Sequence, residues 1–415
     1  MSGFAYRDGE LCAEGVSLSA IAERFGTPAY VYSRAMLEAA WRRFDAAFAG
    51  TPHLVCYAVK ANSSLAILDL FARLGSGFDV VSGGELARVL AVGGDPARIV
   101  FSGVGKSAAE MQAALAADIL CFNVESAPEL ERLASVAANM RRRARVSLRI
   151  NPDVDPRTHP YIATGLKGSK FGIAHTDALA LYRQAASLSS ISVTGIDCHI
   201  GSQITDIGAF VETAARIFDL VDRLAAEGIA LSHVDLGGGI GVRYRDEAVI
   251  GIDDYAAAVR TAAGERRHTL LFEPGRLLVA DAGVLLTRVE YLKRGAASNF
   301  AIVDAAMNDL LRPALYDAWH GVDPARPRDA PADDWEIVGP VCESADFLAH
   351  ARRLALAPGD LLAIRSAGAY AMAMSSNYNT RPRACEVLVD GANAVQIRAR
   401  ERVEDLYAQE SMLPK

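Results

Sequence analysis

The sequence predicts an α/β protein: a TIM-type (β/α)8 barrel with a second, mostly antiparallel β domain. Between about residues 30 and 276, short β-rich runs alternate with longer helical patterns. After Arg276 the pattern changes, and apolar and polar residues alternate between Gly and Pro turns. A chain of 415 residues with 51% hydrophobic content is also long enough to bury two cores.

The first pattern contains eight runs that can each form a buried strand. They cover residues 54–61, 77–83, 99–103, 120–126, 145–151, 191–201, 231–239 and 269–276. The segments between them carry apolar residues at three- and four-residue spacing, with helix signals such as Ser126 followed three residues later by Glu129. Eight β/α units of this length match a TIM barrel over residues 28–276. A doubly wound open sheet is the alternative.

The second domain is expected to combine both ends of the chain. Segments such as residues 281–295, 360–368 and 384–401 read as strands of an antiparallel sheet. The first 27 residues are too short to fold alone. We therefore expect residues 1–27 and 277–415 to form one β-sandwich or β-barrel-like domain.

Composition excludes several classes of function. The formal net charge of −7 leaves no basic surplus for nucleic acid or an anionic membrane surface. The six cysteines are widely spaced and form no CxxC pair, so neither a metal site nor a disulfide framework is predicted. The first ten residues carry no apolar signal stretch, and no run of about 18 apolar residues occurs. We expect a cytoplasmic protein.

Lys60 raises the first question about chemistry, because it ends the apolar run of residues 54–61. A buried ammonium costs several kcal/mol unless it is paired, neutralised or used covalently. A lysine that extends from the strand end into water is the simpler alternative. The residues at the other strand ends decide between these explanations.

In a TIM barrel, chemistry gathers at the carboxyl ends of the strands. The predicted strands that end near residues 61, 201, 239 and 276 carry polar groups at their carboxyl ends. Together, these groups would supply a Schiff-base lysine, a flat imidazole, a phosphate site and a carboxylate partner for a pyridine nitrogen, as pyridoxal phosphate requires. Singly, the triple glycine could be a tight turn, the histidine a core residue, and the glutamate an ion-pair partner of Arg276. The residues are Lys60, His199, Ser202, Gly237, Gly238, Gly239, Glu273, Gly275 and Arg276.

The stretches YAVKAN, HIGSQI, LGGGIG, EPGR, GPVCESADF and GAYAMAMSSNYNTRPR closely resemble diaminopimelate decarboxylases. These are pyridoxal-phosphate enzymes of the alanine-racemase-like fold, among the group IV decarboxylases. The resemblance extends from about Thr27 to Asp390. It implies the cofactor pyridoxal 5'-phosphate, decarboxylation of meso-2,6-diaminopimelate to L-lysine and CO₂ as the last step of lysine biosynthesis, and a homodimer whose active sites are shared across the interface.

The resemblance also implies roles for single residues. Lys60 is similar to the cofactor-bound lysine, His199 to the residue against the cofactor ring, and Glu273 to the carboxylate at the pyridine nitrogen. Cys342 matches a cysteine that returns a proton to Cα. The phosphate contacts implied are Ser202, Gly237, Gly238, Gly239 and Gly275, with Arg276 and Tyr370 nearby. The substrate contacts implied are Arg276, Arg312, Tyr316, Glu343 and Tyr370.

These residue types suit the implied reaction. Loss of CO₂ leaves a carbanion at Cα, which a protonated pyridine ring stabilises. Two arginines, a phenol and a carboxylate match a distal group that bears both a carboxylate and an ammonium. Two alternatives stay open: a decarboxylase of the same fold acting on ornithine, lysine or carboxynorspermidine, and a non-catalytic pyridoxal-phosphate-binding protein. The CES and HIGSQ motifs disfavour the first, and the long β domain disfavours the second.

Overall fold

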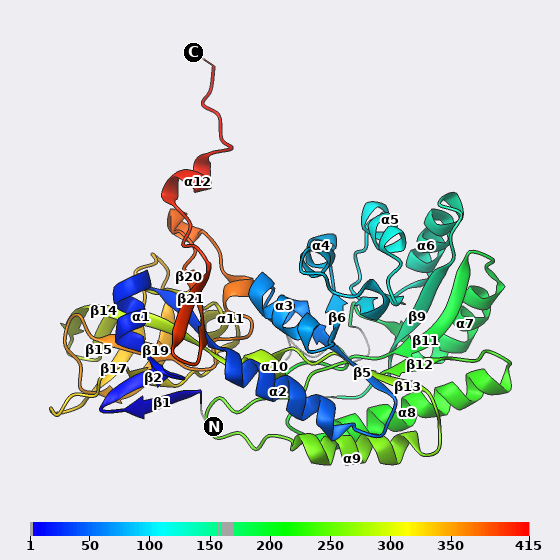
Figure 1. The fold of residues 1–415 in the computed structure, drawn as a ribbon, viewed down its shortest axis with the longest axis horizontal. Helices are drawn as coiled ribbons and strands as arrows, with labels where there is room; N and C mark the ends of the chain where they lie inside the picture. Colours follow the sequence, from blue (N-terminus) through cyan, green and yellow to red (C-terminus); the bar gives the residue numbers. More distant parts are fainter. Residues whose placement is uncertain (1–2, 156–157, 160–163, 165–168, 415) are drawn as a thin grey trace. The chain divides into compact units, whose positions relative to one another are not determined.

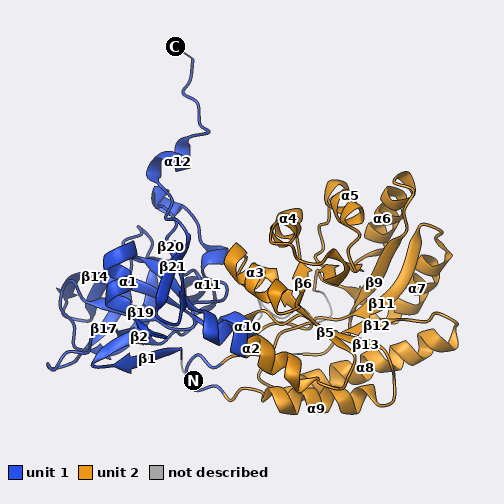
Figure 2. Cartoon of the chain, in the orientation of Figure 1, with its two compact units in different colours: residues 1–39, 243–247, 278–415 blue, residues 40–242, 248–277 orange. Residues whose placement is uncertain are grey.

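The computed structural model describes the chain except residues 1–2, 156–157, 160–163, 165–168 and 415. It consists of two compact units, shown in Figure 2. Unit 1 comprises Met1–Ala39, Arg243–Glu247 and Leu278–Lys415, and unit 2 comprises Ala40–Val242 and Ala248–Leu277.

Unit 2 is a closed parallel barrel. Its eight strands are β5 (His53–Ala58), β6 (Gly77–Val80), β7 (Ile99–Phe101), β8 (Cys121–Val124), β9 (Ala144–Asn151), β11 (Ile191–Asp197), β12 (His233–Asp235) and β13 (Thr269–Phe272). They pair in this order, and β13 pairs with β5 to close the circle. The two-residue strand β10 (Ile173–Ala174) extends the sheet beside β9. The predicted TIM barrel is confirmed, and the open sheet is excluded.

The helices lie outside the barrel strands (Figure 1). They are α2 (Arg34–Ala47), α3 (Leu65–Arg73), α4 (Gly83–Ala91), α5 (Ala108–Ala117), α6 (Ala127–Asn139), α7 (Ala178–Ser187), α8 (Ile207–Ala226), α9 (Ile252–Ala263) and α10 (Arg276–Val279). The longest, α8, buries Phe210, Ala214 and Ile217 at helical spacing. As predicted, Ser126 caps α6 by accepting a hydrogen bond from the Glu129 N–H. In the part of the chain that the structure describes, no helix is both long and apolar enough to cross a membrane.

Unit 1 is built on a mostly antiparallel sheet. Its strands are β4 (Ala29–Ser33), β14 (Gly283–Arg294), β15 (Asn299–Val303), β16 (Val322–Pro324), β17 (Asp333–Val338), β18 (Phe347–Leu354), β19 (Leu361–Ile364), β20 (Cys385–Asp390) and β21 (Asn393–Arg398). A separate meander contains β1 (Phe4–Arg7), β2 (Glu10–Ala13) and β3 (Val16–Ser17). Short helices complete the unit: α1 (Leu18–Phe25), α11 (Arg312–Tyr316) and α12 (Val403–Tyr407).

The N-terminal segment joins this second unit, as expected. Leu11, Leu18 and Ile21 share one apolar core with Val284 and Val387. Strand β4 pairs with β14 and with β20, which places residues 29–33 in the β sheet of unit 1. The compact units therefore divide at residue 40 rather than at the boundary of 28 expected from the sequence.

Candidate active site

Lys60 occupies a 3-10 turn, Val59–Ala61, directly after β5. Its Nζ forms an ion pair with Asp79 on the neighbouring strand β6. The Asp79 side chain is fully buried, whereas the Lys60 side chain is 32% exposed. A buried carboxylate thus fixes the lysine at the barrel end, and the simple explanation of a lysine extended into water does not describe it. Asp79 was not among the residues predicted from the sequence.

Three further carboxylates meet at the same end of the barrel. Asp197 ends β11, Asp235 ends β12, and Glu273 follows β13. One oxygen from each lies within 4.8 Å of the others, and all three side chains are buried. Burial and the nearby charge of Asp79 raise the pKa of Asp235 to about 7. Burial and neighbouring carboxylates hold the pKa values of Asp197 and Glu273 well above their ordinary range. Among these three acids, only Glu273 was predicted.

His199 follows β11 and presents an uncharged ring. Its Nδ1 accepts a hydrogen bond from the Gly238 N–H at 3.2 Å, so the neutral ring carries its proton on Nε2. Burial and the nearby charges of Arg149 and Lys60 hold the pKa of His199 well below its ordinary value. A flat, neutral imidazole suits stacking against an aromatic cofactor ring.

The glycine run packs the strand-end loops against one another. A Cβ on Gly238 would lie 2.1 Å from the Glu273 carbonyl oxygen, and one on Gly239 would lie 2.3 Å from the carbonyl oxygen of Gly201. The Gly237 N–H donates to Asp235 Oδ1 at 2.9 Å, and the Gly238 N–H donates to His199. These glycines are therefore needed for close backbone packing at the strand ends. Their role as phosphate contacts stays a prediction, and two of the N–H groups already have acceptors in the protein.

A second group at this end of the barrel suits an anion. Arg276, at the start of α10, donates from Nη2 to Ser202 Oγ at 3.0 Å. The Arg276 side chain is buried, and Ser202 is half-buried. Gly275 lets the end of β13 approach the end of β5, because a Cβ there would lie 3.0 Å from the Ala61 side chain. The loop that carries Glu273 and Arg276 thus lies beside the turn that carries Lys60.

These groups fit pyridoxal phosphate. At this end of the barrel, three buried carboxylate oxygens of the described residues have no hydrogen-bond partner: Asp79 Oδ1, Asp197 Oδ1 and Asp235 Oδ2. Such acceptors are unusual in protein interiors and are typical of a site that binds a polar ligand. The donor set adds an amine, a neutral imidazole, and a guanidinium beside a hydroxyl. Asp197, Asp235 and Glu273 also have the spacing of a cation site. Arg149, however, lies 3.9 Å from Asp197 and supplies positive charge there.

The remaining predicted residues belong to unit 1. Arg312 begins α11, and its side chain is buried although it stands at a helix end. Its Nη1 donates to His320 Nε2 at 2.8 Å, and its guanidinium lies 4.3 Å from the centre of the Tyr244 ring. Tyr316 ends the same helix and is half-buried.

Cys342 and Glu343 lie on the loop between β17 and β18, and both are exposed. The Cys342 N–H donates to Asn379 Oδ1 at 3.3 Å, and the Tyr378 hydroxyl donates to the Glu343 carboxylate. The thiol is therefore not the small buried group that a lone cysteine usually is. Tyr370 lies after β19 with a φ of 54°, a left-handed conformation that is uncommon for a tyrosine. Tyr378 and Asn379 were not predicted, although they lie in the GAYAMAMSSNYNTRPR stretch.

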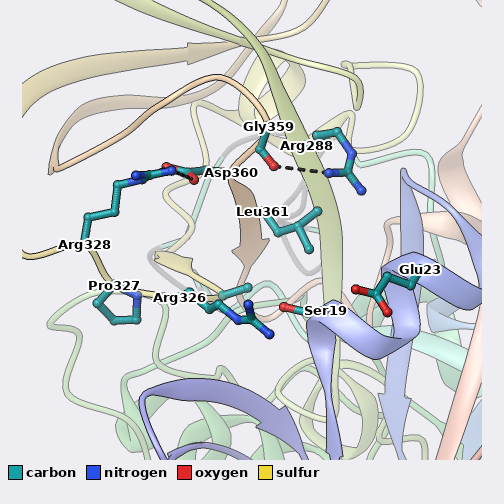
Figure 3. Close-up of a pocket in the computed structure, with 10 residues that line it drawn as sticks. Ser19, Glu23, Arg288, Arg326, Pro327, Arg328, Gly359, Asp360 and Leu361 are labelled. Atoms are coloured by element: carbon teal, nitrogen blue, oxygen red, sulfur yellow. Dashed lines mark hydrogen bonds and ion pairs between the residues drawn. The ribbon is translucent and has the colours of Figure 1, made fainter.

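Unit 1 also carries a surface pocket of about 440 Å³ (Figure 3). None of the predicted site residues lines it. Two of its arginines already have carboxylate partners: Arg328 pairs with Asp360 at 2.6 Å, and Arg326 pairs with Glu10 at 3.3 Å. We therefore do not assign the chemistry to this pocket.

Comparison with known proteins places the chain in a family. Residues 34–280 match the family model described as "Pyridoxal-dependent decarboxylase, pyridoxal binding domain". A diaminopimelate decarboxylase from Pseudomonas aeruginosa is 62% identical over the whole length of both chains, and one from Vibrio cholerae is 56% identical, also over both whole chains. The chain belongs to the diaminopimelate decarboxylase family. A solved diaminopimelate decarboxylase from Helicobacter pylori, complexed with L-lysine, is 42% identical and has a TM-score of 0.92. That comparison covers 94% of this chain and 98% of the other.

Proposed function

We infer that the chain is a pyridoxal-phosphate-dependent enzyme that removes CO₂ from meso-2,6-diaminopimelate and yields L-lysine. The observation that carries this inference is the barrel end itself, where Lys60 pairs with a buried Asp79 close to a buried Glu273. This arrangement offers an amine and a carboxylate to one cofactor in a chain related to diaminopimelate decarboxylases over its whole length.

Each group at the barrel end has a proposed task. When bound, pyridoxal phosphate supplies a protonated pyridine ring that accepts the electron pair left at Cα as CO₂ departs. Lys60 would hold the cofactor covalently, and Glu273 would keep the ring nitrogen protonated. His199 would support one face of the ring without adding charge. Ser202 and Arg276 would bind anionic groups, with Gly237, Gly238, Gly239 and Gly275 allowing close backbone approach.

The distal end of the substrate is assigned to a further set of polar residues. Arg276, Arg312 and Tyr316 would bind its carboxylate, while Glu343 would bind its ammonium beside Tyr370. A substrate without the distal carboxylate, such as ornithine, would lose the charge-assisted hydrogen bonds to the arginines. The buried position of Arg312 supports this role, because a guanidinium held in a fixed orientation recognises a carboxylate well.

We further propose a homodimer in which Cys342 and Glu343 of one copy act in the active site of the other. The exposure of both side chains on one loop of unit 1 supports such a role. Cys342 would return a proton to Cα after CO₂ has left. We also propose a cytoplasmic location, because six widely spaced cysteines that are all free thiols suit a reducing compartment.

Product analysis tests the activity. Protein loaded with pyridoxal phosphate is given meso-diaminopimelate or ornithine in separate reactions, with the Lys60→Ala variant as control. We expect CO₂ and L-lysine from the first substrate only, and no turnover by the variant. Decarboxylation of ornithine without decarboxylation of diaminopimelate would contradict the proposed substrate. Normal turnover by the Lys60→Ala variant would contradict the proposed site.

A further inference from the structure

A series of hydrogen-bonded, buried polar side chains extends through the barrel interior from Glu273. Glu273 Oε1 accepts hydrogen bonds from Ser102 Oγ and from Asn123 Nδ2, both at 3.3 Å. Asn123 Nδ2 also lies 3.1 Å from Ser102 Oγ. Ser102 follows β7, and Asn123 belongs to β8. TIM-barrel interiors are usually filled by branched apolar side chains, so polar residues at these positions call for an explanation.

Cys121 fixes the orientation of the Asn123 amide. Its Sγ donates to Asn123 Oδ1 at 3.7 Å, which turns the amide nitrogen toward Glu273. Burial raises the pKa of the Cys121 thiol, so the S–H proton stays available for this bond. Asn123 therefore presents a donor, not an acceptor, to the Glu273 carboxylate.

The end of this polar series that lies farthest from Glu273 is uncharged. His233 Nε2 lies 2.7 Å from Ser147 Oγ and 3.6 Å from Cys121 Sγ. Burial and the nearby His268 lower the pKa of His233 to about 4, so the ring is neutral. Gly195 provides the room, since a Cβ there would lie 2.1 Å from His233 Nε2. The polar series thus provides hydrogen-bond donors to Glu273 without adding a charge.

Glu273 needs such donors. It is buried near Asp79, Asp197 and Asp235, and both burial and these charges favour its protonated form. Hydrogen-bond donors stabilise the ionised carboxylate more than the neutral acid. We propose that Asn123 and Ser102 are positioning residues that keep Glu273 ionised and direct it toward the cofactor nitrogen. This inference rests on the role proposed for Glu273.

The test compares Asn123→Leu and Ser102→Ala with a matched control, Thr213→Val. Thr213 carries a buried hydroxyl on α8 and does not belong to the polar series. The measurements are the affinity of each cofactor-free variant for pyridoxal phosphate and the visible absorption of the bound cofactor. Loss of a hydrogen bond to an ionised group predicts about tenfold weaker binding for either test variant. We also expect the visible band to lose intensity to a near-ultraviolet band, because the ring nitrogen is less often protonated. The control should retain both properties.

A double-mutant cycle with Glu273→Gln separates a positioning role from a structural one. If Asn123 acts through the Glu273 carboxylate, Asn123→Leu weakens binding less than twofold in the Glu273→Gln background. Equal losses in both backgrounds would overturn the proposal, and so would wild-type binding and absorption in both test variants. Ser102→Ala removes only one oxygen atom and serves if Asn123→Leu does not fold. Unchanged cofactor binding by Glu273→Gln alone would instead refute the proposed role of Glu273 itself.

Discussion

Sharing of the active site between two copies of the chain gives a quantitative prediction. Lys60 lies at the end of β5 in unit 2, whereas Cys342 lies on the exposed loop after β17 in unit 1. A Lys60→Ala chain still offers an intact Cys342, and a Cys342→Ala chain still offers an intact Lys60. In a mixed dimer with shared sites, one site has both groups intact and the other has neither.

The recovered activity follows from this geometry. Subunit exchange between equal amounts of the two variants makes about half of the dimers mixed, and each mixed dimer has one working site of two. Roughly a quarter of wild-type CO₂ release from meso-diaminopimelate should therefore return. Native mass spectrometry of the two chains, one carrying a mass label, shows whether exchange has occurred.

A second mixture provides the matched control. Lys60→Ala and Glu273→Gln both alter unit 2, so every site in their mixed dimer carries one defect and no activity should return. Absence of recovery in the first mixture, with exchange demonstrated, would refute the shared site and leave the proposed activity untouched. Recovery in the control mixture would contradict the reasoning as well, because two defects in the same barrel cannot complement each other.

Three further predictions concern single residues. Arg312→Ala should lower kcat/KM for meso-diaminopimelate by about 10- to 100-fold while the visible absorption of the cofactor is unchanged; normal kcat/KM would exclude a substrate role. Because the folded-state pKa of Asp235 is raised to about 7, its protonated form stabilises the fold below pH 4, and this contribution is lost as the pH rises toward 7. Thermal unfolding of the cofactor-free protein should therefore show that Asp235→Asn is more stabilising at pH 8 than at pH 5, by up to about 2.7 kcal/mol; equal effects at both pH values would contradict this. Gly238→Ala should lower the free energy of unfolding by at least about 2 kcal/mol, because its Cβ would meet the Glu273 carbonyl oxygen. The control Gly105→Ala, whose Cβ would have nothing within 4 Å, should change the free energy of unfolding by less than about 0.5 kcal/mol. Similar values for both variants would contradict this prediction.

The barrel could be predicted because its signals are local. Each of the eight strands overlaps one short apolar run, and most of the helices between them carry apolar periodicity or a capping residue. The ends of the strands were less accurate: the run 231–239 yields only β12, His233–Asp235, because Gly237 and Gly239 after it adopt positive φ angles that a strand does not have. The position of β4 depends on pairing with β14 and β20, far away in the sequence. No local pattern in residues 29–33 reveals those partners.

The candidate site was predicted in part for a similar reason. Lys60, His199 and Glu273 stand in recognisable strand-end motifs. Asp79 and Asn123 are single polar residues inside apolar runs, where a sequence shows only an interruption of the strand. Their roles depend on barrel closure, which brings β6 and β8 into one circle with β5 and β13. A lone polar residue within a predicted barrel strand is therefore a useful signal, provided that the fold has been identified first.

The buried acids connect stability with function in this fold. Burying Asp197, Asp235 and Glu273 opposes folding, since burial and repulsion from neighbouring carboxylates, Asp79 among them, raise their pKa values. Neutral donors from Ser102 and Asn123 relieve only Glu273. A cationic ring nitrogen would weaken the repulsion among all of these carboxylates. Part of the binding free energy of the cofactor should therefore come from removing repulsion that is present in the cofactor-free fold. A ligand that binds only the folded state stabilises it in proportion to the logarithm of its excess concentration. The increase in stability on cofactor binding should therefore fall when Asp235 is replaced by Asn, even though that variant makes the cofactor-free protein more stable.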